Sequence, residues 1–173
     1  MEIYISSNDY FWTRYVDAYF GDSIGLLPKG IFRAKDWDEL VYVKSSVQLV
    51  NSINREINSL NIGILTSLPN VTQYDDTKKQ NVSGFDALSY IEALNETSPV
   101  VVYFAKAIAG QIALKAITEI CLSFSRMYNS NPKGLPKKIM FMYKKEDEHV
   151  EGIYNANDDI DEFVDCFKKY SET

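Results

Sequence analysis

Hydrophobic and polar positions along the chain follow two periods, one of about two residues and one of about 3.6, which predict strands and helices respectively. Apolar side chains alternate in residues 2–6, 137–143 and 150–154, and a β-rich apolar run covers residues 62–67. Each of these segments predicts a β-strand. The acidic residues 146–148 predict the turn that joins two of them into a hairpin.

Apolar residues that recur at three- and four-residue steps predict helices. The first covers residues 11–20. The clearest covers residues 37–61, because Asp36 and Glu39 form a capping box at its start. A final helix follows Asn157, which we expect to cap it, and the acids of its first turn complement the positive end of the helix dipole.

The apolar tract after residue 98 allows two interpretations. Ser98 and Pro99 have the form of an N-cap followed by a proline at the first helical position, which favours one helix over residues 99–128. The alternative makes residues 100–104 a buried strand and starts the helix at Ala105, because periodicity does not separate strand from helix in a continuous apolar run. We expect the single helix.

Three further segments have weaker patterns. Residues 22–35 contain two glycines and a proline, which is typical of a turn flanked by short extended pieces. Residues 68–84 are polar and predict an exposed loop. A short helix is expected over residues 84–94.

These elements predict a single domain, residues 1–173, in the α/β or α+β class. We expect the four strands to form one mixed β-sheet, packed with long amphipathic helices and ending in a C-terminal β-hairpin and helix. A content of 46% hydrophobic and 24% charged residues is that of a packed globular chain. Cys121 and Cys166 fall in apolar stretches without a CxxC motif, so we expect two buried free thiols.

The charge of the chain is concentrated at its C-terminal end. Residues 144–173 carry ten acids and four bases, which accounts for the whole net charge of −6. An acidic surface there argues against nucleic-acid binding and favours a basic protein partner. The acids expected to contact that partner are Glu146, Asp147, Glu148, Glu151, Asp158, Asp159, Asp161, Glu162 and Asp165.

No catalytic, cofactor or metal motif is recognisable, so neither a cofactor nor enzymatic activity is expected. His149, the one histidine, adjoins the predicted hairpin turn and is expected at the surface. The glycines of residues 21–30 match neither a dinucleotide-binding nor a phosphate-loop pattern. Asn and Asp alternate over residues 155–161 as in a calcium loop, but Ile160 and Cys166 stand where that loop requires Gly and Glu.

Neither a secretory signal nor a membrane span is expected. The N-terminus lacks the basic and apolar regions of a signal peptide. The longest apolar tract, residues 99–124, is interrupted by Lys106, Lys115 and Glu119. These features predict a cytoplasmic protein without membrane association.

In its size, its acidity, its abundance of Asn, Lys, Ile and Tyr, and its lack of motifs, the chain resembles bacterial immunity proteins. Such proteins neutralise a cognate toxin, often a basic nuclease, by direct binding. The resemblance implies a non-enzymatic inhibitor of a basic toxin domain. Two alternatives stay open: a component of a bacterial defence or signalling assembly, and an enzyme that uses Tyr, Asp and Lys side chains from several loops.

Overall fold

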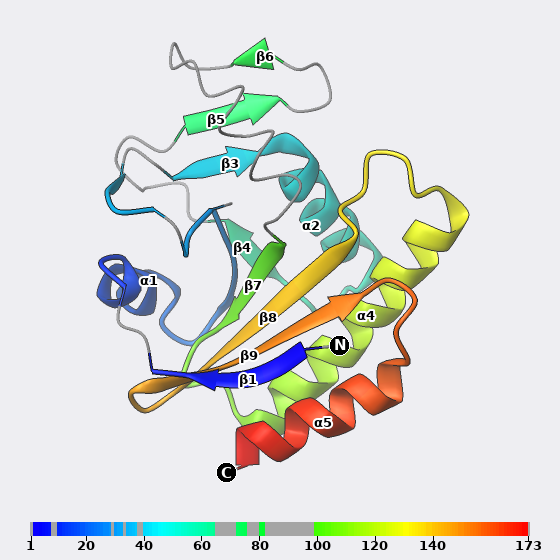
Figure 1. Ribbon diagram of the computed structural model, residues 1–173. Coiled ribbons are helices and arrows are strands. Elements are labelled where there is room, and N and C mark those ends of the chain that lie inside the picture. Colours follow the sequence, from blue (N-terminus) through cyan, green and yellow to red (C-terminus); the bar gives the residue numbers. More distant parts are fainter. Residues whose placement is uncertain are drawn as a thin grey trace.

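The protein forms a mixed six-stranded β-sheet with helices on both faces and a second, three-stranded sheet at one end (Figure 1). It is an α+β fold. The computed structural model describes residues 2–7, 10–28, 30–32, 34–37, 40–64, 72–75, 80–81 and 99–172.

The large sheet has the strand order β1-β9-β8-β7-β2-β4. Its strands are β1 (Glu2–Ser6), β2 (Ile24–Leu27), β4 (Ile62–Ile64), β7 (Val100–Phe104), β8 (Lys138–Lys145) and β9 (Glu148–Asn155). The pairs β7–β8 and β2–β4 are parallel, and the other pairs are antiparallel. Because β1 and β8 both run antiparallel to β9, the strands β1, β7 and β8 share one direction, and their carboxyl ends lie at the same edge of the sheet.

Helices cover the two faces of the large sheet unequally. They are α1 (Thr13–Phe20), α2 (Lys44–Glu56), α4 (Gly110–Ser130) and α5 (Ile160–Glu172). One face packs against α4 and α5, where the ring of Phe163 contacts those of Phe141 and Tyr154. On the other face, Phe20 of α1 packs against Tyr103 of β7.

Helix α2 packs beside α4 through polar contacts as well as apolar ones. The Ser123 hydroxyl donates to Glu56 Oε2 at 2.7 Å, and Arg126 Nη1 lies 2.5 Å from Glu56 Oε1. No helix among the described residues is both long enough and apolar enough to cross a bilayer.

The four strands predicted from the sequence all lie in the large sheet. Three of them correspond to β1, β8 and β9, the last two forming the expected hairpin. The fourth begins at Ile62 and ends at Ile64, and residues 65–67 lie outside the described residues. A further strand, β2, lies in the segment predicted as a turn flanked by short extended pieces, and β2 pairs with both β7 and β4.

The expectation of a single sheet is wrong, because a second one exists. It consists of β3 (Val41–Val43), β5 (Thr72–Asp75) and β6 (Gln80–Asn81), with β3 parallel to β5 and β5 antiparallel to β6. Strand β3 lies within the segment predicted as helix, and β5 and β6 lie within the predicted loop. The helix expected over residues 84–94 lies outside the described residues.

The helix predicted over residues 37–61 is correspondingly shorter and begins at Lys44. Leu40 to Val43 form a continuous buried apolar run, which suits a strand covered on both sides. The Asp36 carboxylate accepts a hydrogen bond from Trp37 N at 2.7 Å, the residue directly after it, instead of capping a helix. Asp38 and Glu39 lie outside the described residues.

The single helix expected over residues 99–128 is also wrong, and the alternative strand is confirmed. Residues 100–104 form β7, in which every side chain is at most 3% exposed. A strand between two neighbours and under two covered faces has no solvent-facing side, so its sequence shows no alternation. The following helix, α4, begins at Gly110, and Ala105 belongs to the connection before it.

The first and last helices are present with small changes at their starts. Helix α1 begins at Thr13. Helix α5 begins at Ile160, and its N-terminal cap is Asp159 instead of Asn157, because Asp159 Oδ1 accepts a hydrogen bond from Glu162 N at 2.9 Å.

Candidate functional site

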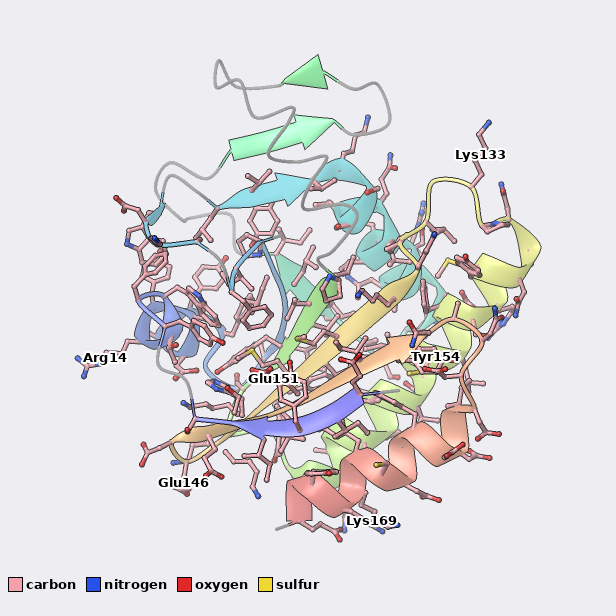
Figure 2. All side chains as sticks on the ribbon, viewed as in Figure 1. Arg14, Lys133, Glu146, Glu151, Tyr154 and Lys169 are labelled. Atoms are coloured by element: carbon pink, nitrogen blue, oxygen red, sulfur yellow. The ribbon has the colours of Figure 1, made fainter. Side chains whose placement is uncertain are left out.

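The acids expected to form a partner surface fall into two groups. Glu146, Asp147 and Glu148 lie at the turn between β8 and β9, whereas the others, apart from Glu151, lie at the start and along the first half of α5. Figure 2 shows Glu146 and Tyr154 at opposite ends of this hairpin. An eight-residue strand such as β9 is roughly 25 Å long, so the groups are separated by about the length of that strand.

Glu151 is not part of any surface, which corrects the expectation for this residue. It is 3% exposed and lies opposite Tyr4 in the β1–β9 register. Its neighbours Val150 and Gly152 point to the α5 side, so Glu151 points to the opposite, also covered, face. Burial raises the pKa of Glu151, and a hydrogen bond with the Tyr4 hydroxyl lowers it by less.

Some of the remaining acids already have structural roles. The carboxylate of Asp158 accepts hydrogen bonds from Asn155 N and Nδ2, both at 3.0 Å, and Asp159 caps α5. Glu146 forms an ion pair with Lys106 at 3.1 Å. Three exposed carboxylates of α5 have no ion pair within the described part of the chain; they belong to Asp161, Glu162 and Asp165.

A pocket of about 790 Å³ lies at the edge where β1, β7 and β8 end. In sheets with parallel strands, ligands bind preferentially in the crevice outside the carboxyl ends of the strands. Its charged lining residues are Arg14, Asp17, Lys106, Lys144, Glu146 and Asp147. They come from α1, from the β7–α4 connection, from the end of β8 and from the hairpin turn. The expected partner surface included the two hairpin acids but none of the other four residues.

Two glycines of the sheet fix α1 beside this pocket. Gly25 and Gly63 are neighbours in the β2–β4 register, and the ring of Phe20 lies over both. At its other end, α1 is held by Trp12, which is fully buried and whose Nε1 donates to Ile31 O at 2.9 Å. The helix is therefore anchored at both ends, which determines where Arg14 and Asp17 lie.

A buried polar group lies directly behind the pocket. The hydroxyl of Tyr103, which is fully buried, donates a hydrogen bond to the carboxylate of Asp17. Burial and this carboxylate raise the pKa of Tyr103, so its phenol stays neutral and acts as a donor. Asp17 also lines the pocket, and among the described residues no side chain donates to its second carboxylate oxygen.

His149 lies beside this group, and its predicted surface position is wrong. Its side chain is 1% exposed, and its ring centroid lies 6.4 Å from that of Tyr103. The alternation of β9 points residue 149 toward the face that α1 covers, where it lies opposite Ser6 of β1. A position next to a hairpin turn is therefore no guide to exposure when both faces of the sheet are covered.

The two cysteine thiols differ in burial. Cys121 is buried, and burial, with a smaller effect of Asp158, raises its pKa. Cys166 is only partly buried, so the expectation of two buried thiols is correct for Cys121 alone; both are free, as expected. Within the described residues, no group of three or more His, Cys, Asp or Glu side chains is arranged to hold a metal ion.

Comparisons with protein-family models, with curated proteins and with solved structures find no match for this chain.

Proposed function

We propose that this chain is a non-enzymatic binding protein that contacts a basic protein partner through the exposed acids of α5. The observation that supports the proposal is the position of three exposed acids of α5, in which Asp165 lies four residues after Asp161 and three residues after Glu162. Residues at this spacing share one side of a helix. The opposite side of α5 is fixed to the sheet by Phe163 and Phe167, both at most 1% exposed.

These acids are not needed to form the helix. The N-terminus of α5 is already capped by Asp159, and one or two carboxylates in the first turn are enough to complement the helix dipole. Asp165 lies beyond the first turn, where the dipole contributes little. Charges of this kind on a rigid, exposed element accelerate association with a partner of opposite charge.

The class of partner follows from the same charges. A net charge of −6 repels nucleic acids, so the partner is a protein, and a basic toxin domain fits best. The protein would then act as an immunity protein, neutralising the toxin by direct binding in the cytoplasm. A component of a defence or signalling assembly would use the same surface on a different partner.

The proposal is tested with the product of the adjacent gene, because an immunity protein is encoded next to its toxin. The purified pair is mixed, and the association rate is measured from low to moderate salt. The test variant replaces three α5 acids (Asp161→Asn, Glu162→Gln, Asp165→Asn), and a matched control removes three exposed acids outside α5 (Asp22→Asn, Asp147→Asn, Glu148→Gln).

We expect the α5 variant to associate about tenfold more slowly at low salt and with a weaker salt dependence, while the control stays close to the unaltered protein. Both variants should keep their melting temperature, since none of the substituted side chains is buried. Equal rates for the two variants, or no complex with the neighbouring product, would contradict the proposal.

A further inference from the structure

We propose that the pocket at the carboxyl ends of β1, β7 and β8 binds a phosphate-bearing small molecule of nucleotide size. This inference is independent of the proposed partner, because the α5 acids do not line the pocket. The volume of about 790 Å³ lies within the range of small-molecule sites and exceeds what a single inorganic ion fills.

Lys144 is the residue that points most directly to an anion. It lies near the end of β8, opposite His149 in the register, and it lines the pocket. Among the described residues no carboxylate lies within ion-pair distance of its ammonium group. Lys144 is a half-buried residue, and an ammonium group that lines a pocket and forms no ion pair with a described carboxylate favours a ligand that carries negative charge.

A second cation comes from a different element. Arg14 lies on α1 one turn before Asp17, and both line the pocket. Figure 2 shows the Arg14 side chain extending from the molecule into solvent, so that it stands at the rim. A guanidinium there can turn onto a bound phosphate and bind two of its oxygens at once.

Three acids also line the pocket, Asp17, Glu146 and Asp147, but among the described residues none of them forms an ion pair with Arg14 or Lys144. Glu146 is paired with Lys106 at 3.1 Å, and this ion pair forms one side of the rim. Asp17 accepts the hydrogen bond of Tyr103, and its remaining oxygen can accept from a ligand hydroxyl. Two cations that form no ion pair with a described carboxylate, with Asp17 beside them, match a phosphate attached to a hydroxyl-bearing group, as in a nucleotide.

Small residues leave the rest of the wall open. Gly21, Ala105 and Ala107 line the pocket, and a Cβ at Gly21 would meet no atom within 4 Å. Gly21 has φ +57°, a conformation that favours glycine and lets α1 end at the pocket. The backbone is thus accessible to a ligand on this side.

The test measures binding of AMP and of inorganic pyrophosphate to the full chain by calorimetry, with malonate as a dicarboxylate of similar charge. We expect AMP and pyrophosphate to bind with dissociation constants below about 1 mM. Lys144→Gln should weaken both by at least about tenfold, because it removes a charge-assisted contact. Lys145→Gln is the matched control, since the adjacent residue points to the opposite face of β8 and does not line the pocket.

A second variant should change affinity in the other direction. Glu146→Gln releases Lys106 from its ion pair and removes a negative charge from the rim, so AMP should bind about threefold more tightly. Its control is Glu148→Gln, an exposed acid of the same hairpin that does not line the pocket. Thermal unfolding of each variant checks that the fold is retained.

Three results would overturn the proposal. The first is binding of AMP and pyrophosphate weaker than about 1 mM to the unaltered protein. The second is an equal loss of affinity in Lys144→Gln and Lys145→Gln, which would reflect overall charge instead of a site. The third is binding of malonate as tight as that of pyrophosphate, which would refute the phosphate class. None of these measurements involves the α5 acids, so the partner proposal can fail or succeed separately.

Discussion

Replacing Gly25 by alanine tests whether the contact between β2 and Phe20 fixes α1. A Cβ built at Gly25 would lie 2.0 Å from Phe20 Cζ, 2.1 Å from Cε1 and 2.4 Å from Cε2. Carbon atoms in contact are about 3.5–4.0 Å apart, so the ring has to leave its place. Phe20 is 4% exposed and packs between Tyr19 and Tyr103, which leaves it little room to move.

The cost of this change lies between two known limits. Overpacking a core costs about 1–3 kcal/mol when neighbours can adjust. Losing a buried phenylalanine altogether costs about 3–5 kcal/mol. We expect Gly25→Ala to lower the free energy of unfolding by about 2–4 kcal/mol, even though alanine is otherwise the better residue inside a strand.

Urea unfolding, followed by circular dichroism, measures this cost. Gly63→Ala is the matched control, because its Cβ would lie 3.5 Å from Phe20 Cε1, an ordinary contact, and we expect a change below about 1 kcal/mol. In a Phe20→Ala background the ring is absent, so adding Gly25→Ala should cost little. Equal costs for the two glycine variants, or additive costs in the double variant, would refute the reasoning.

Three further predictions concern the core and the thiols. Burial raises the pKa of Glu151, so the folded protein binds the carboxyl proton of this residue more tightly than the unfolded chain does. The stability contributed by the protonated carboxyl is complete below the ordinary carboxyl pKa. It is lost as the pH rises through the pKa of the folded state. Glu151→Gln stays neutral, so it should be more stable than the unaltered protein near pH 7 but not near pH 4. The gain near pH 7 should be about 1.4 kcal/mol for each tenfold difference in proton affinity between the folded and the unfolded protein. A difference in urea unfolding that does not vary with pH would contradict this. Gly152→Ala would place a Cβ 2.8 Å from Phe167 Cδ2 and 3.1 Å from Phe163 Cζ, so we expect the free energy of unfolding to fall by about 1–3 kcal/mol. An unchanged melting temperature would exclude this destabilisation. Cys166 should react with a thiol reagent in the native state well before Cys121, whose pKa burial raises; equal rates would show that the α4 side of the core is open.

The sequence predicts a strand best where a side-chain pattern and a turn mark it together. In β8, Ile139, Phe141 and Tyr143 alternate with the two methionines between them, and the acidic turn after the strand marks the hairpin. Strand β7 is likewise buried on both faces, but no turn directly follows it to separate strand from helix. Strand β3 failed for a related reason: Leu40 and Val43 fit the spacing of the helix that follows, and only pairing with β5 separates them from it.

The candidate site could be predicted less well than the fold. Glu151 is expected at the surface as one of the C-terminal acids, and His149 because it adjoins the predicted hairpin turn; charged and polar residues are usually exposed. Their burial depends on what covers the second face of the sheet, which local sequence does not contain. Arg14 and Lys106 are not selected either, since they are far apart in the chain and line one pocket only because β7 ends beside α1.

A usable signal for the pocket lies in the glycines of the strands. Glycine is unfavourable inside a strand unless another group needs the space, so Gly25 and Gly63 indicate a close approach to the sheet. Their pairing in neighbouring strands makes one hollow, and Phe20 fills it from the end of α1. The same helix carries Arg14 and Asp17 to the pocket, so the hollow also determines the geometry of the site. Gly25→Ala should therefore weaken AMP binding as well as stability, whereas Gly63→Ala should leave both nearly unchanged; a Gly25→Ala protein that binds AMP normally would show that the pocket does not depend on the position of α1.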